Sequence, residues 1–192
     1  MSKNDPADKR QRNKTIRWVV LIFIVTIFVS GAISLLSDVL MENSSMGVAF
    51  LILLVIILVG IAFDVIGMAV ASADEKPFHS MAARKVPGAQ EAIRLLRNAE
   101  RVSSICNDVI GDICGVVSGS AAATIAVQIL AKMEATWPKL ISLAMSALAA
   151  GLTVGGKAIG KGFAVKSSTQ IVHSVGKMIY MLRHFSICRK EK

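Results

Sequence analysis

The sequence predicts an all-α integral membrane protein with four transmembrane helices, and two observations lead to this class. First, 54% of the 192 residues are hydrophobic, 18% are charged and the mean hydropathy is +0.60, outside the range of a soluble domain. Second, a membrane-spanning helix needs about 20 predominantly apolar residues, and four windows meet this need. They are residues 18–36, 47–73, 105–130 and 140–156. We expect these helices to contact the lipid bilayer of a cell membrane.

The distribution of basic residues predicts the topology, because cytoplasmic segments of membrane proteins hold an excess of Lys and Arg. All but Lys132 and Lys139 of the 22 basic residues fall before the first window, between the second and third, or after the fourth. Both termini are therefore expected in the cytoplasm. The same split supports the third window as a span, although it is the least apolar of the set.

The chain is expected to begin with a basic cytoplasmic arm, residues 1–16, and an extra first transmembrane helix, residues 17–40. A retained anchor is favoured over a cleaved signal peptide, because no A-x-A-like site interrupts the apolar run. One transmembrane domain, residues 46–187, is expected to hold the other spans. A basic tail, residues 188–192, follows it.

Two segments outside the spans have amphipathic patterns. Residues 74–101 contain a Pro87-Gly88 break, which ends one helix and begins another. Residues 166–186 carry apolar side chains at the i, i+4, i+7 spacing of one helix face. We expect a cytoplasmic amphipathic hairpin from the first segment and a C-terminal amphipathic belt helix, lying in the membrane interface, from the second. Ordinary packing helices would have the same pattern.

Polar residues occur inside the apolar windows, where an ionisable side chain is costly and marks a candidate functional site. Asp64 interrupts the second window, and Asn107, Asp108 and Asp112 lie near the start of the third. Asp64 and Asp112 are each expected about 15 Å from the cytoplasmic end of their helix, so they are expected to face each other. The windows contain no Lys or Arg to neutralise them. The alternative is that an acid is protonated or hydrogen-bonded for helix packing alone.

Carboxylate, amide and backbone oxygens are hard ligands of the kind that Mg²⁺ prefers over soft metals. We therefore expect these side chains to line one polar cavity that opens to the cytoplasm and binds a divalent cation. Lys157 is expected on the cytoplasmic side of this cavity. No organic cofactor is expected.

Glycines at i, i+4 spacing let membrane helices approach closely, because contact in lipid depends on packing. Two windows contain such glycines: Gly111, Gly115, Gly119, Gly151 and Gly155. We expect them in the bundle core or in a dimer seam. Glycines beside Asp108 and Asp112 also favour exposure of backbone carbonyls to a cation.

Four segments resemble motifs of the transmembrane domain of the cyclin M (CNNM) and CorB/CorC family, which is implicated in magnesium transport. Residues 72–81 resemble S-A-S-E-x-x-L-x-S-L, residues 92–101 resemble A-x-x-L-L-x-x-P-E-R, residues 110–112 resemble I-G-N-N, and residues 156–161 resemble G-E-x-x-P-K. The matching positions include Glu75, Ser80, Glu100, Arg101, Gly156 and Lys161. The chain departs from these motifs at Ala99 and Gly160, where Pro is usual, and at Lys157, where Glu is usual.

The resemblance covers residues 60–185. It implies three membrane helices per protomer, a cytoplasmic hairpin and belt helix, a homodimer, and a cation bound between the helices. It adds Ser72 as a cation-coordinating residue and places Asp112 where the family has Asn. No segment resembles the family's CBS domains, so regulation by ATP is not implied.

Two function classes follow. The first is a transport protein for Mg²⁺ or a related divalent cation, with coupling to Na⁺ or H⁺ left open. The second is a non-transporting membrane scaffold or partner subunit that keeps the family's fold. An enzyme is not expected, because no nucleophile and base pair, phosphate loop or H-E-x-x-H pattern appears. A nucleic-acid partner is not expected either, because the positive-inside bias accounts for the net charge of +9.

Overall fold

The computed structural model describes residues 6–42, 44–132 and 138–188. Over these residues the chain forms helices and no strand. Four stretches are long and apolar enough to cross a membrane: Ile16–Met41, Met46–Ser72, Ala99–Ala131 and Pro138–Lys166. The predicted class, an all-α multi-pass membrane protein, is therefore confirmed.

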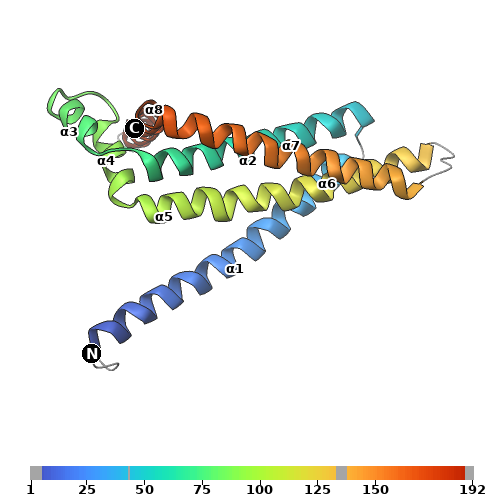
Figure 1. Cartoon of the computed structure of the whole chain (residues 1–192), viewed down its shortest axis with the longest axis horizontal. Helices are drawn as coiled ribbons and strands as arrows, with labels where there is room; N and C mark the ends of the chain where they lie inside the picture. The colour runs from blue at the N-terminus through green and yellow to red at the C-terminus, as the bar shows by residue number, and fades with distance from the viewer. Residues whose placement is uncertain (1–5, 43, 133–137, 189–192) are drawn as a thin grey trace.

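The first helix, α1, runs from Pro6 to Glu42 and diverges from the other helices toward its N-terminus (Figure 1). Helical backbone thus begins inside the segment that was predicted as an arm. None of its apolar window is buried, as expected of a helix that is hydrophobic on every side and faces lipid. Its contacts with the bundle are few. Ile22 packs beside Val109 and Ile113, and Gln128 donates a hydrogen bond to the Met41 carbonyl at 3.0 Å.

The second helix, α2, extends from Met46 to Ser72 and packs against the third and fourth spans. Its buried positions recur every three or four residues, which places them on one helix face. Most of this stripe is Ala49, Leu53, Ile57, Gly60, Asp64, Gly67 and Val70. Asp64 thus lies in the register of the core residues and not on a lipid-facing side.

The third span is one helical run with a change of winding inside it. It consists of α5 (Ala99–Ser104), a π-helical segment η1 (Ile105–Gly111) and α6 (Asp112–Lys132). π-Helical turns are rare and frequently occur at functional sites. Asn107 and Asp108 lie inside η1, and Asp112 follows it directly.

The fourth span, α7, runs from Pro138 to Lys166, ten residues beyond the predicted end of the span at residue 156. Lys157 and Lys161 lower the hydropathy of this part, which set the predicted end, but neither residue interrupts a helix. Both lysines therefore belong to the spanning helix. Because the helix extends this far, two lysines reach the polar residues of the bundle interior.

Two short helices, α3 (Lys76–Ala83) and α4 (Ala89–Arg97), follow α2, and the last helix, α8, covers Ser168–Cys188. α8 is seen nearly end-on at the end of the bundle where α3 and α4 lie, so its axis runs across the bundle (Figure 1). Gly88 has a φ of +86°, and a side chain there would overlap the α8 backbone at Lys177. Only glycine readily adopts this positive φ and also leaves room for the α8 backbone.

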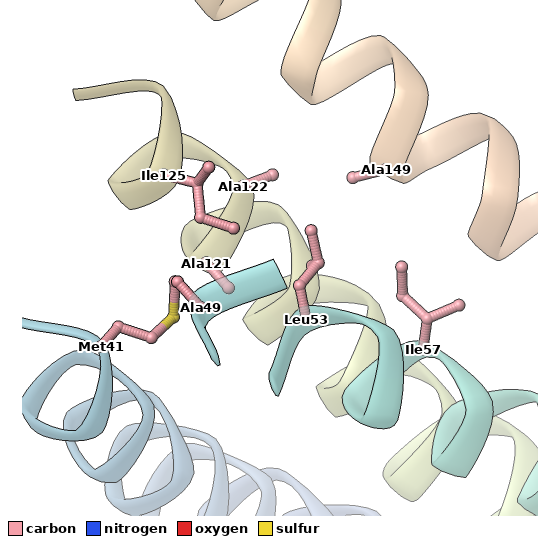
Figure 2. Packing of buried hydrophobic residues seen from close by; sticks show 8 residues of the cluster. All are labelled: Met41, Ala49, Leu53, Ile57, Ala121, Ala122, Ile125 and Ala149. Carbon is pink, nitrogen blue, oxygen red and sulfur yellow. The ribbon is translucent and has the colours of Figure 1, made fainter. Parts of the chain in front are cut away.

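The buried apolar residues described form three clusters, of which the smallest consists of Val109, Ile113 and Val117 of the third span. The two larger ones lie toward opposite ends of α2. One cluster joins α1, α2, α6 and α7 (Figure 2) and consists of Met41, Ala49, Leu53, Ile57, Ala121, Ala122, Ile125 and Ala149. The other joins α2, α3, α4, α7 and α8 and consists of Ala69, Val70, Phe78, Ala92, Ile93, Ala164 and Val172. Along α2, the residues Gly60, Asp64 and Gly67 lie between the two clusters.

Candidate cation site

Asp64 is almost completely buried, with 4% of its side chain exposed. Asp64 lies about 12 Å along the helix axis from the C-terminal end of α2. At that depth an uncompensated charge costs several kcal/mol. Its neighbours must therefore supply positive charge, a proton or hydrogen bonds. The structure identifies the neighbours as lysines of α7.

The ammonium group of Lys157 lies among oxygen atoms from two other spans. Its Nζ donates a hydrogen bond to the Gly111 carbonyl at 3.1 Å. The same nitrogen is 3.9 Å from Asp64 Oδ1 and 3.8 Å from Asp112 Oδ1. We call these four groups the Lys157 site: the carboxylates of Asp64 and Asp112, the Gly111 carbonyl and the Lys157 ammonium.

Lys161, one helical turn further along α7, approaches the other oxygen of the buried acid. Its Nζ is 3.7 Å from Asp64 Oδ2, and 48% of its side chain is exposed. The two carboxylates and two ammonium groups balance in formal charge. The expectation that no lysine neutralises the intramembrane acids is therefore wrong, because α7 stays helical past residue 156. Lys157 also lies between the acids and not to one side of them.

Gly111 is the last residue of η1, and its lack of a side chain matters at this point. A Cβ there would lie 3.3 Å from Lys157 Nζ and 3.5 Å from Asp64 Oδ1. The first distance is tight, so the ammonium would have to shift, whereas the second is an ordinary van der Waals contact. The glycine thus allows the lysine, the acid and a backbone carbonyl to meet, which agrees with the expectation that a glycine here exposes a carbonyl to a cation.

The structure brings Asp64 and Asp112 to one nitrogen atom, as the similar depths predicted. It does not bring the other candidates there. Ser72 is the last residue of α2 and is exposed, about 12 Å of helix from Asp64. Asn107 packs against Gly67, where a side chain would overlap its amide. Its Nδ2 donates to Ser103 Oγ at 3.3 Å, and its buried Oδ1 has no hydrogen-bond partner among the described residues.

Asp108 lies in a separate surface pocket of about 500 Å³. The lining residues are Ala71, Ala99, Glu100, Ser103, Ser104 and Asp108. Ser104 donates a hydrogen bond to Asp108 Oδ2 at 2.8 Å. Asp64, Ser72, Asn107 and Asp112 are not among the described residues that line this pocket, so the expectation of one shared cavity is wrong. The reason is that Asp64 faces α7, whereas Asp108 faces the end of α2.

The packing glycines differ from the predicted set. Around Gly115, Gly119, Gly151 and Gly155, an added Cβ meets nothing within 4 Å among the described residues. These positions are therefore not in the core of the protomer, and a dimer seam stays a prediction for them.

The close approaches of the helices involve other glycines. In α2, an added Cβ at Gly60 would lie 2.8 Å from Cys114 Cβ. In α7, Gly156 and Gly160 pack against Ile61 and Val65 of α2, with a Cβ at Gly160 only 2.6 Å from Val65 Cγ2. The small residues of α7 thus bring the lysine-bearing helix against α2.

The family-motif positions have structural contacts of their own. Glu75 accepts a hydrogen bond from Arg97 Nε at 3.2 Å, and Ser80 Oγ donates to the Pro77 carbonyl at 2.7 Å. Arg101 lies 5.4 Å from the centre of the Trp18 ring, a cation–π distance that ties α1 to α5. Glu100, Gly156 and Lys161 have the contacts described above.

Sequence reasoning missed the role of Lys157 and Lys161. The signal was present, because the two lysines are four residues apart and share a helix face with Gly156, Gly160 and Ala164. Hydropathy conceals this signal, since it treats the lysines as the end of the span.

A metal ion would find a limited set of ligands here. Within the described residues no three His, Cys, Asp or Glu side chains group together in a way that could hold a metal ion. The Lys157 site offers two carboxylates and one carbonyl, which are hard donors, whereas Mg²⁺ takes six oxygen ligands and usually keeps several of its waters. The site alone thus supplies fewer ligands than Mg²⁺ takes, and bound water would have to provide the others.

No family model, curated protein or solved structure matches this chain.

Proposed function

We propose that the protein transports Mg²⁺ or a related divalent cation across a membrane, with Asp64, Asp112 and the Gly111 carbonyl as cation-binding groups. The observation that carries this proposal is the convergence of oxygen atoms from α2, η1 and α6 on one positive charge, the ammonium of Lys157. Coupling to Na⁺ or H⁺ belongs to the same proposal. The chain's resemblance to the CNNM and CorB/CorC transmembrane domain supports this class of function.

The burial of Asp64 indicates which class of ligand the Lys157 site would bind. A carboxylate that is 4% exposed at bilayer depth creates a strongly negative potential. The second carboxylate, Asp112, is 72% exposed and adds an acceptor at the open edge of the site. The groups that satisfy such a potential are cations. Because all the donors are oxygens, a hard cation is the ligand class that they favour.

A topology with both termini in the cytoplasm fits this function. The segments rich in Lys and Arg then lie on one side, and α3 and α4 form a cytoplasmic hairpin with α8 as a belt helix in the interface. In support, α8 buries Val172 and Gly176 but exposes Met178, Met181 and Leu182. A reporter fused after Lys192 is expected to read as cytoplasmic, and an extracellular reading would contradict this topology.

A homodimer is part of the same proposal. The half-buried Gly115 and the exposed Gly119 of α6, with the exposed Gly151 and Gly155 of α7, offer small-residue surfaces that suit contact between protomers in lipid.

A second function class has its own supporting observation. The two lysines already balance the charges of Asp64 and Asp112, so the bundle does not need a metal ion to be stable. This neutrality favours a non-transporting membrane scaffold or partner subunit.

Flux measurements separate the two classes. Purified protein in liposomes is expected to move Mg²⁺ down an imposed gradient, as followed by an entrapped Mg²⁺ indicator. Asp64→Asn is the matched loss-of-site variant, and Gly31→Ala, at an exposed position of α1 with open space around it, is the control for the handling of the protein. Equal and negligible flux in all three preparations would support the scaffold.

A further inference from the structure

The distances at the Lys157 site are not those of a permanent structural salt bridge. A close ion pair has N···O separations of about 2.7–2.9 Å, whereas Lys157 stands 3.9 Å and 3.8 Å from its two carboxylates. Asp64 Oδ2 is buried and has no hydrogen-bond partner among the described residues. A buried pair stabilises a protein only when its geometry is close and its remaining lone pairs are satisfied. The acids therefore keep unused capacity for a positively charged ligand.

The position of the lysine also limits what else can bind. With Lys157 and Lys161 both in place the four charges balance, so a divalent cation would add two uncompensated charges beside the buried Asp64. The Asp112 side chain is 72% exposed, so this acid lies at the open edge of the site. When the Lys157 ammonium leaves, half of that excess disappears. The remaining positive charge belongs to Lys161, which is 48% exposed and so is partly screened by solvent.

The side chain of Lys157 is suited to such a departure. Its ammonium has one direct hydrogen bond, to the Gly111 carbonyl, and 18% of the side chain is exposed. A lysine has a flexible four-carbon stem, so its charged end can move several ångströms while α7 stays fixed. The carbonyl, which has no side chain beside it, stays in place for the next ligand.

We infer that Lys157 is a tethered cation that competes with free cations for the carboxylates of Asp64 and Asp112. A free cation binds between these acids when the ammonium leaves, and the lysine sets how much free cation is required. This inference rests on the proposed function, because it concerns the same acids. It gives Lys157 the role of determining the affinity of the site.

The test compares apparent Mg²⁺ affinity between variants of the purified full-length chain in lipid nanodiscs. The measurement is the Mg²⁺-dependent rise in unfolding temperature at constant ionic strength, because a ligand that binds the folded state stabilises it. Lys157→Met removes the ammonium and keeps an apolar stem. Lys161→Met makes the same change one turn away, at a more exposed group without a bond to Gly111. We expect the apparent affinity to rise at least about tenfold in Lys157→Met and clearly less in Lys161→Met.

Three results would overturn the inference, and they differ in what they say of the proposed function. Equal affinity in wild type and Lys157→Met, with Mg²⁺ flux present, removes the competition but leaves cation transport intact. A larger gain in Lys161→Met assigns the competing charge to the other lysine. No Mg²⁺ effect in any variant, together with no flux, removes the proposed function as well.

Folding of the variant provides a second readout. Loss of the ammonium leaves Asp64 short of positive charge, so Lys157→Met is expected to give less folded protein when Mg²⁺ is absent during purification. Recovery of the folded yield by MgCl₂, and not by an equivalent ionic strength of NaCl, supports the replacement of the lysine by a divalent ion. Failure of MgCl₂ to restore a variant that does not fold contradicts it.

Discussion

The two halves of α2 pack against different kinds of side chain. In its N-terminal half, Leu53 and Ile57 meet alanines of α6 and α7 in a cluster of aliphatic side chains (Figure 2). In its C-terminal half, the same stripe continues as Gly60, Asp64 and Gly67, and its neighbours are Cys114, Asn107 and the lysines of α7.

The difference between the halves shows where the helix serves stability and where it serves binding. Aliphatic packing in lipid gives a bundle its shape without polar specificity. Charges and bare glycine backbone cost stability, and they are retained where a ligand or a polar contact requires them. The half that contains Asp64 is therefore the half to which we assign the proposed cation binding, and substitutions that affect the two halves differently can test this assignment.

The largest expected effect is at Asp64. Asp64→Asn leaves Lys157 and Lys161 beside a neutral amide, and removing one partner of a buried ion pair costs about 3–5 kcal/mol. Reversible unfolding in detergent micelles measures the loss. Asp64→Asn combined with Lys157→Met is expected to recover part of it, as a double-mutant cycle reports. If Asp64→Asn is as stable as the wild type, the acid is a protonated packing group.

The next effect lies in the aliphatic half. Ile57→Ala opens a cavity between α2 and α7, but in lipid the transfer of the side chain out of water contributes little. We therefore expect a cost near the lower end for such truncations, about 2 kcal/mol, in the same unfolding assay. The Mg²⁺-dependent rise in unfolding temperature should not change. A loss of that response in Ile57→Ala would mean that the two halves are not separable.

The smallest effect comes from a matched pair of glycines. A methyl group at Gly67 overlaps the side chain of Asn107 and lies 2.9 Å from Cys106 Cβ, so Gly67→Ala is expected to cost about 1–3 kcal/mol. Gly31 of α1 has open space around it, and Gly31→Ala should leave stability unchanged or raise it by up to about 1 kcal/mol, because alanine is the better helix former. Thermal unfolding of the two variants checks this order. A greater loss in Gly31→Ala than in Gly67→Ala would contradict the packing seen at these two positions.

The spans themselves follow from hydropathy, and α2 begins and ends within one residue of the predicted window. The break before Gly88 was also predictable, because Pro87 and Gly88 together end a helix. The presence of Asp64 and Asp112 at matching depth followed from helix rise alone. In each case a local property of the sequence decides the structure.

The partners of these acids could not be predicted in the same way. Hydropathy ended the fourth span before Lys157, whereas α7 stays helical to Lys166. Glycines make helix propensity weak in this stretch, but Gly156 and Gly160 pack against α2 there. The choice among glycines depends on the rotation of α7 against α2, and this rotation selects Gly156 and Gly160 over Gly151 and Gly155. Both pairs have the same spacing, so no local rule separates them. The π-helical winding of η1 has no composition signal either.

The length of α1 sets how far the chain reaches beyond the bilayer. The helix has 37 residues, which corresponds to about 55 Å of rise, whereas the hydrocarbon core is about 30 Å thick. Its apolar part begins at Ile16, so the preceding turns from Pro6 form a polar extension of about 15 Å. The sequence of that extension includes Lys9, Arg10, Arg12 and Lys14. Because the backbone is one continuous helix from Pro6 to Glu42, the extension prolongs the axis of the apolar part, and its direction is fixed by that of the first span.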